Sequence, residues 1–122
     1  MLSVVKNLKL KNNENSFSKS GFKAQAKDRL CTLYLIKCWN ETELFYKIGI
    51  TADTVKRRFH STRHMPYNYE IVKEQFGEAE SIWTIENNLK QQLTSHYTPT
   101  IKFAGSVREC YSDLNEILSA LN

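Results

Sequence analysis

The sequence predicts a small α+β domain in which a three-stranded, mainly antiparallel sheet is flanked by helices. The first observation behind this prediction is a pair of apolar segments with strand composition, residues 32–38 and 45–51, which only six residues of turn-like sequence separate. Such close spacing is typical of adjacent antiparallel strands. The second observation is the order of the patterns that follow: helix, strand, helix, connecting segment, helix. Strands and helices that do not alternate regularly favour an α+β architecture over a parallel α/β one.

Length and charge predict one domain with a basic extension. A chain of 122 residues, 41% hydrophobic and 25% charged, is long enough for one core and too short for two. Residues 1–29 carry seven Lys or Arg against two acidic residues, whereas residues 30–122 carry ten against eleven. We therefore expect a basic N-terminal arm over residues 1–29 and a folded domain over residues 30–122. The arm either only solubilises the domain or contacts phosphates, and docking of Phe17 and Phe22 would order part of it.

Cysteine usage and hydropathy predict the cellular setting. None of the three cysteines forms a CxxC pair, so neither a disulfide framework nor a zinc site is expected. No apolar run approaches the roughly 20 residues of a membrane span. We therefore expect no membrane partner and a reducing, cytoplasmic compartment.

The segment after the second strand predicts a helix over residues 53–64. Thr54 supplies a side chain that favours a helix N-terminus, and Val55 and Phe59 lie one turn apart on the same face. Pro66 cannot continue a helix, so the helix should end shortly before it.

The second half of the chain predicts one more strand and two more helices. Strand composition returns at residues 69–76, which Gly77 closes, and a helix should follow over residues 78–95. Asp113 and Glu116 can form a capping box at the start of a third, short helix. The apolar residues that share one face of the helix over residues 78–95 are Ile82, Ile85, Leu89 and Leu93.

One acidic residue, Glu86, falls inside this apolar face, between the positions of Ala79 and Ile85. Burying an unpaired carboxylate costs several kcal/mol, so its side chain should be protonated, paired or bound to a metal. The simplest alternative is that Glu86 reaches the edge of the core and pairs with an arginine. A carboxylate in such a position is also a candidate for a functional site.

Alternation along the two hairpin strands places a tyrosine near a lysine. Lys47 and Gly49 share one face of the second strand, while Tyr46 is on the other face. A lysine beside a glycine leaves a notch that a nucleic-acid backbone could approach closely. Tyr34 lies on the first strand, where a tyrosine by itself is an ordinary packing residue. Only the combination of these residues with Glu86 indicates a site.

The helix predicted over residues 53–64 carries Arg57 and Arg58, and it also contains His60 and His64. On a helical wheel Arg58 flanks the buried stripe, so it can reach toward the sheet, whereas Arg57 faces away and would touch a phosphate farther along a strand. An arginine pair on a helix is otherwise most often part of a solvated face.

The order of these features resembles that of the GIY-YIG nuclease superfamily over residues 31–111. Members have a first strand that ends in Tyr, a second strand with a Tyr-Ile-Gly or similar triplet, an arginine early in the next helix and a glutamate on a later helix. Here Thr-Leu-Tyr at residues 32–34 stands for the first triplet, and Lys-Ile-Gly at residues 47–49 stands for the second. The run Tyr-Lys-Ile-Gly-Ile-Thr at residues 46–51 and the ending at residues 101–111 are similar to the phage-associated branch of the superfamily.

The resemblance implies a phage-encoded, metal-dependent endonuclease that hydrolyses phosphodiester bonds of nucleic acid, above all DNA, in the cytoplasm of the host cell. Glu86 would hold Mg²⁺ or Mn²⁺, and Tyr34 would act as general base or position the attacking water. Lys47 would supply a positive charge beside Tyr34, and Arg58 would stabilise charge on the phosphoryl oxygens. The spacing leaves open whether Arg57 or Arg58 takes the superfamily's arginine position. The second-rank substrate contacts are Tyr46, Arg57, His60 and His64.

The alternative is a nucleic-acid-binding or interference factor that has the same scaffold and does not cleave. Aromatic residues beside basic ones, such as Trp39, serve binding as readily as catalysis. Duplex, single-stranded and branched DNA and RNA are all compatible with these residues, and so is any oligomeric state.

Overall fold

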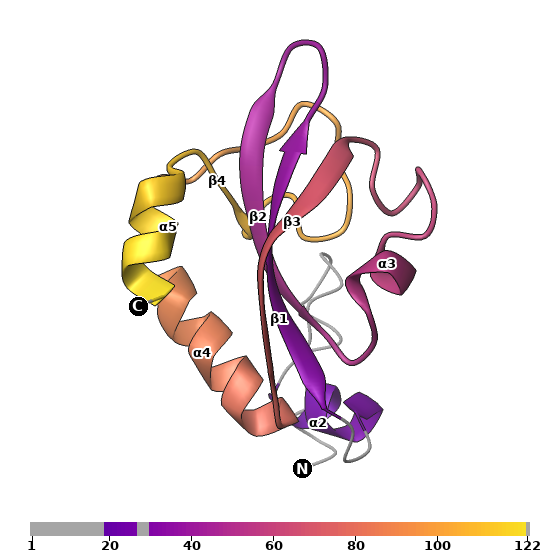
Figure 1. The fold of residues 1–122 in the computed structure, drawn as a ribbon, viewed down its shortest axis with the longest axis vertical. Coiled ribbons are helices and arrows are strands. Elements are labelled where there is room, and N and C mark those ends of the chain that lie inside the picture. The colour runs from indigo at the N-terminus through magenta and orange to yellow at the C-terminus, as the bar shows by residue number, and fades with distance from the viewer. Residues whose placement is uncertain (1–18, 27–29, 122) are drawn as a thin grey trace.

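The computed structural model describes residues 19–26 and 30–121 (Figure 1). Its elements confirm the α+β class. None of the helices in the described part of the chain has the length and apolar character needed to cross a bilayer. In chain order the elements are α2 (Lys19–Ala26), β1 (Cys31–Trp39), β2 (Leu44–Thr51), α3 (Val55–Arg58), β3 (Asn68–Gly77), α4 (Ala79–Gln92), β4 (Cys110–Tyr111) and α5 (Leu114–Leu121).

The sheet has four strands in the order β3-β1-β2-β4, one more than the three expected. Every pairing is antiparallel, and β1 and β2 form the predicted hairpin with Tyr34 opposite Gly49. The additional strand, β4, is two residues long and pairs with β2 at Tyr46 and Lys47. Two residues are too few to show the alternation of apolar and polar side chains by which a strand is recognised. This strand therefore leaves no pattern in the sequence.

Helices cover both faces of the sheet. In Figure 1, α4 and α5 lie on one side of the sheet and α3 lies on the other. Because side chains alternate along β1, Leu33 and Leu35 pack with residues of α4, whereas Tyr34 and Ile36 pack with residues of α3. The core therefore consists of two apolar clusters that the sheet separates.

The prediction of a helix over residues 53–64 is wrong in length, because α3 is a single turn, Val55–Arg58. The helix begins at Val55, two residues later than predicted, but the capping role of Thr54 is confirmed, since its Oγ1 accepts a hydrogen bond of 3.1 Å from a backbone N–H in the first turn. The chain leaves the helix at Phe59, where φ is −115° and ψ is 44°. Phe59 and Met65 are both buried in the cluster on this face. Both ends of the following turn are thus held in the core, which overrides the local helical pattern.

The helix predicted over residues 78–95 is also shorter, because α4 ends at Gln92. The side chain of Glu116 determines where α4 ends. Its carboxylate accepts hydrogen bonds from the backbone N–H groups of Thr94 and Ser95, at 3.0 and 3.1 Å, instead of reaching back in a capping box. Asp113 still caps α5, since its Oδ1 accepts a hydrogen bond of 3.2 Å from the N–H of Glu116. With these N–H groups bonded outside the helix, α4 cannot continue.

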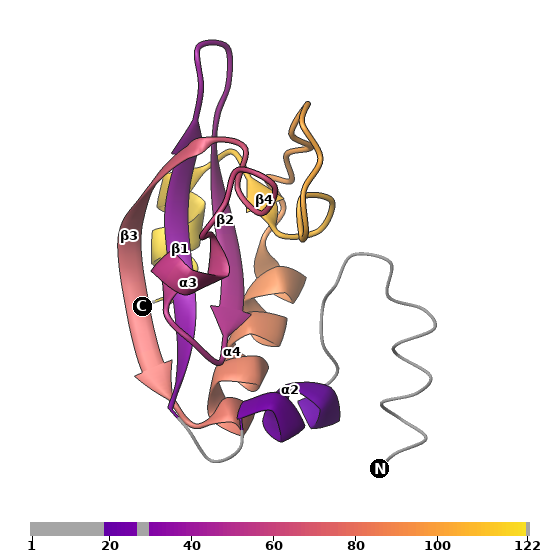
Figure 2. The ribbon, with the colours of Figure 1, turned by 90° about the vertical axis from the view of Figure 1, so that its right-hand side faces the viewer.

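Part of the predicted basic arm is folded. Helix α2 lies against the lower end of α4 (Figure 2). Phe22 and Ala26 of this helix are fully buried in the same cluster as α4. The stretch Lys19–Ala26 therefore belongs to the domain, through the docking of Phe22 that the sequence left open. The other residues of the arm, Phe17 among them, lie outside the described residues.

Candidate active site

The first pair in the candidate site is Tyr34 on β1 and Gly49 on β2, which lie opposite each other in the sheet. A Cβ atom on Gly49 would lie 2.3 Å from the phenol oxygen of Tyr34 and 2.5 Å from its Cζ. Only a glycine leaves room for the ring at this point. The notch expected beside Gly49 therefore exists, but the side chain of Tyr34 fills it, so a nucleic-acid backbone cannot enter there.

Lys47 lies next to Tyr34 and is completely buried. Its Nζ donates hydrogen bonds to the phenol oxygen of Tyr34 at 3.0 Å and to Glu109 Oε1 at 2.6 Å. The ammonium also lies 5.1 Å from the centroid of the Tyr34 ring and 5.7 Å from that of Phe59, distances at which a cation is attracted to an aromatic face. The fold thus brings together the tyrosine and the lysine that the sequence singles out.

Glu109 is a site residue that the sequence analysis missed. Its backbone carbonyl accepts a hydrogen bond of 2.9 Å from the N–H of Ile48, which holds it at the edge of β2. Gly105, with a φ of +84°, makes room for the carboxylate, since a Cβ there would lie 2.4 Å from Glu109 Oε1. The available signal was that Glu109 is the single acid within residues 101–111. Residues 101–111 contributed to the resemblance, but no catalytic or metal-binding role was assigned to Glu109 from the sequence.

Two residues of α4, Glu86 and Lys90, complete the cluster. Lys90 Nζ donates a hydrogen bond to Glu109 Oε2 at 3.1 Å and lies 3.4 Å from Glu86 Oε2. Glu86 is only 6% exposed, in agreement with its place in the apolar stripe. Its Oε2 is shielded from solvent and accepts no hydrogen bond from the described residues. The partner of Glu86 is therefore a lysine of its own helix instead of the arginine considered from the sequence.

These contacts form a continuous polar chain from Tyr34 through Lys47, Glu109 and Lys90 to Glu86. The two ends of the chain belong to opposite faces of the sheet. Tyr34 packs in the cluster beneath α3, whereas α4 packs on the other face. Glu109 lies beside Ile48, directly before the first residue of the two-residue β4, so the polar chain passes around the edge of β2 there.

Burial and neighbouring charges set the protonation states. Burial raises the pKa of the Tyr34 phenol, although the charges of Lys47 and Arg58 act in the opposite direction. Burial alone would lower the pKa of Lys47, but Glu109 and Tyr34 outweigh it and the pKa rises. Burial opposes ionisation of Glu109 as well, yet Lys47 and Lys90 lower its pKa. At neutral pH the site therefore holds a neutral phenol, two ammonium groups and an ionised Glu109.

Glu86 is the group in this cluster best suited to a metal ion. Burial, followed by the negative charge of Glu109, raises the pKa of Glu86 to about 7, while Lys90 and Lys47 act against this shift. A buried carboxylate oxygen without a hydrogen bond is a suitable donor for Mg²⁺, which takes one or two protein carboxylates and keeps several waters. The residues present thus fit the ion that the resemblance implies. Within residues 19–26 and 30–121, no three or more His, Cys, Asp or Glu side chains gather into a larger metal site.

The structure separates the two arginines of α3. Arg58 is half-buried, with its Cζ 5.3 Å from the centroid of the Phe59 ring, and its charge acts on the phenol of Tyr34. The side chain of Arg57 is 75% exposed, and its Nη1 lies 3.2 Å from Asp53 Oδ2. Arg58 is therefore the arginine that the fold brings near the phenol, in agreement with its place on the helical wheel.

The other expected substrate contacts lie in two different places. Tyr46 packs against the cluster under α4, on the face of the sheet opposite Tyr34, so the fold does not bring it together with the phenol and Lys47. His60 and His64 lie in the turn after α3, with their ring centroids 4.6 Å apart. After burial and the neighbouring His60, the charge of Arg58 is a further cause that lowers the pKa of His64. The two histidines therefore lie on the same side of the domain as Arg58, at the surface.

Comparison with known proteins adds no relatives. No protein-family model, curated protein or solved structure matches this chain. The resemblance to GIY-YIG nucleases therefore rests on the motifs of this sequence alone.

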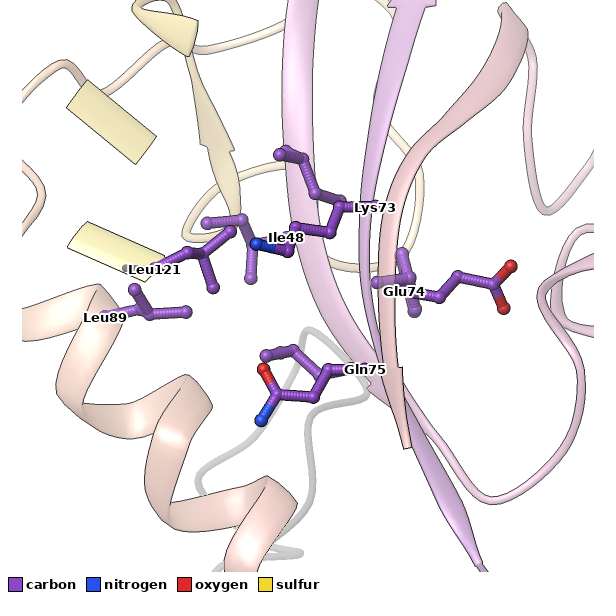
Figure 3. A pocket seen from close by; sticks show the side chains of 9 residues that line it. Ile48, Lys73, Glu74, Gln75, Leu89 and Leu121 are labelled. Carbon is purple, nitrogen blue, oxygen red and sulfur yellow. The ribbon is translucent and has the colours of Figure 1, made fainter. Parts of the chain in front are cut away.

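A small gap in the core lies between the sheet and the helices α4 and α5 (Figure 3). Leu89 and Leu121 face Ile48, Lys73 and Gln75 across a free volume of about 10 Å³. This volume is at the lower limit for a single water molecule, so the gap is not a ligand site.

Proposed function

We propose that this protein is a phage-encoded, metal-dependent endonuclease of the GIY-YIG type that hydrolyses phosphodiester bonds of nucleic acid, with DNA as the expected substrate and the host cytoplasm as its setting. The observation that supports this proposal most is the buried contact of Tyr34 with Lys47 over Gly49, joined by charged side chains to Glu86. Burying charged groups is costly even when they are paired, and apolar residues of similar volume often serve stability as well or better. Retention of so many charges in a small core therefore favours a chemical role.

Tyr34 acts in this proposal as a neutral hydrogen-bond donor. Its oxygen accepts a hydrogen bond from Lys47, so its own O–H remains free to donate to the attacking water. The raised pKa means that the phenol is rarely ionised near neutral pH. This favours positioning of the water over removal of its proton, the two roles that the resemblance allows for Tyr34.

Arg58 and Glu86 act on the phosphate from different sides in this proposal, Arg58 from beside α3 and Glu86 from α4, at the far end of the polar chain. Arg58 donates to the phosphoryl oxygens, where a planar guanidinium stabilises the negative charge that develops during hydrolysis. Glu86 holds Mg²⁺ or Mn²⁺, which when bound polarises a phosphoryl oxygen and lowers the pKa of its water. Arg57, His60 and His64 contact phosphates farther along the strand, where they fix its position without reading its sequence.

Cleavage of labelled DNA by purified protein tests the proposal. The wild-type protein should nick or cut DNA with Mg²⁺ or Mn²⁺ and stop when EDTA is added. Glu86→Gln and Tyr34→Phe should each lower the rate by about two to four orders of magnitude while the protein stays folded. Matched controls are Glu80→Gln, an exposed acid on the same helix, and Tyr46→Phe, which removes a hydroxyl on the opposite face. Both controls should retain the wild-type rate, and full activity of Glu86→Gln would show that the metal ligand is wrongly assigned.

One observation favours the alternative, a nucleic-acid-binding or interference factor that does not cleave. The centre of the site is shielded from solvent. Tyr34 and Lys47 are 1% and 0% exposed. When Glu86 is ionised, its carboxylate and that of Glu109 match the ammonium groups of Lys47 and Lys90, so the cluster carries little net charge. Under this alternative DNA binding would depend steeply on salt, no divalent metal would support cleavage, and Glu86→Gln would bind DNA as the wild type does.

A further inference from the structure

Two buried carboxylates at one end of the polar chain share a single, more exposed lysine. The side chains of Glu86 and Glu109 are 8% and 10% exposed, whereas that of Lys90 is 24% exposed. The Nζ of Lys90 lies 3.4 Å from Glu86 Oε2 and 3.1 Å from Glu109 Oε2. This ammonium therefore lies beside the carboxylate oxygen that we assign to the metal.

The two contacts of Lys90 differ in kind. Toward Glu109 it makes a hydrogen bond, and Glu109 has a second cation in Lys47 at 2.6 Å. Toward Glu86 it makes only an ion pair, and Glu86 Oε2 is left without a hydrogen bond among the described residues. No other cation of the described part of the chain lies within ion-pair distance of Glu86. Glu86 is thus the carboxylate that gains most from an additional cation.

We propose that Lys90 occupies the place of the divalent cation in the metal-free protein and moves off Glu86 when the cation binds. This inference rests on the proposed function, in which Glu86 is the metal ligand. In the metal-free site, when Glu86 is ionised, the two ammonium groups balance the two carboxylates. A dication added without any movement of Lys90 would leave excess positive charge in a buried region, where repulsion between like charges is strong.

Lys90 is able to move because of where its side chain lies. Its stem leaves α4 at a half-buried position, so the ammonium can reach solvent while its methylene groups stay against the protein. Its hydrogen bond to Glu109 can be given up as well, because Glu109 still accepts a hydrogen bond of 2.6 Å from Lys47. Lys90 therefore compensates the charge of the two carboxylates in the absence of metal, and it competes with the metal for Glu86.

Competition of this kind is a coupling between two cations, and such couplings typically change an affinity about 5- to 150-fold. We expect Lys90→Met, which keeps the length of the side chain and removes its charge, to tighten Mn²⁺ binding by about tenfold or more. Mn²⁺ binding is measured without DNA, from the electron paramagnetic resonance signal of the free ion. Lys90→Arg keeps the charge and should bind Mn²⁺ no more tightly than the wild type. Lys23→Met is the matched control, since Lys23 of α2 pairs at 3.0 Å with Glu80, an exposed acid of α4.

A second measurement uses the wild-type chain, so it does not depend on the folding of any variant. If Lys90 leaves Glu86, saturating Mn²⁺ should increase the rate at which acetic anhydride modifies Lys90, followed by mass spectrometry, and should leave the rate at Lys23 unchanged. Mn²⁺ binding that is equal in wild type and Lys90→Met, or an acetylation rate of Lys90 that does not rise, overturns this inference and leaves the proposed function standing. Absence of Mn²⁺ binding in the wild type and in Lys90→Met overturns both.

Discussion

Replacing Gly49 with alanine should displace Tyr34 and destabilise the domain. The added Cβ would lie 2.3 Å from the phenol oxygen, 2.5 Å from Cζ and 3.0 Å from Lys47 Nζ, all closer than van der Waals contact. Tyr34 is 1% exposed and packs edge-on against Phe59, with ring centroids 5.5 Å apart, so it cannot shift without disturbing the core. Overpacking costs about 1–3 kcal/mol, and loss of the hydrogen bond from Lys47 adds about 1 kcal/mol. We therefore expect a loss of roughly 2–4 kcal/mol in the free energy of unfolding.

Urea unfolding followed by tryptophan fluorescence measures this loss. With an m-value of about 1–3 kcal/mol per molar urea, the midpoint should fall by roughly 1 M or more. Gly77→Ala is the control, because a Cβ there would meet only Ile82, at 3.4 Å, which is ordinary contact. In a Tyr34→Leu background the ring is absent, so Gly49→Ala should then cost less than about 1 kcal/mol, and the double-mutant cycle isolates the contact. A midpoint for Gly49→Ala equal to that of Gly77→Ala would refute the placement of Tyr34 over Gly49.

Two further predictions concern acid stability and thiol reactivity. Hydrogen bonds from Ser95 and Thr94 lower the pKa of Glu116 to about 2, below its unfolded value of about 4.3. The stabilising effect of the ionised Glu116 is therefore complete above the unfolded pKa and is lost as the pH falls toward 2. The urea midpoint of Glu116→Gln should be lower than that of the wild type at pH 7 and should change less between pH 5 and pH 2. Equal pH profiles for variant and wild type would contradict this role. Burial raises the pKa values of the Cys38 and Cys110 thiols to about 12, and Cys31 is buried as well, so a disulfide-exchange reagent at pH 8 should modify these cysteines only after unfolding. Rapid modification of the native protein would show that this part of the core is open.

The pattern of the sequence was sufficient for the hairpin and for the burial of Glu86, because both follow from local geometry. Strand alternation assigns Tyr34 to one face of β1 and Lys47 to one face of β2. Helical periodicity assigns Glu86 to the buried face of α4. The same wheel geometry separates Arg58 from Arg57, even though α3 is much shorter than predicted.

The length of α3 and the end of α4 could not be predicted in the same way. Burial of Phe59 and Met65 in one cluster bends the chain after a single helical turn. The carboxylate of Glu116, from another helix, takes the N–H groups that would have extended α4. In both cases a contact between distant segments outweighs a weak local propensity.

Local patterns therefore decided which side of each strand and helix a residue takes, and with it the identity of Tyr34, Lys47 and Glu86 as candidates. How these residues are joined depended on the folded chain. Glu109 meets Lys47 across 62 positions of sequence, directly before β4 begins beside β2. Periodicity describes the face of one element at a time, whereas an ion pair between distant segments forms only when the packing of the whole domain brings them together.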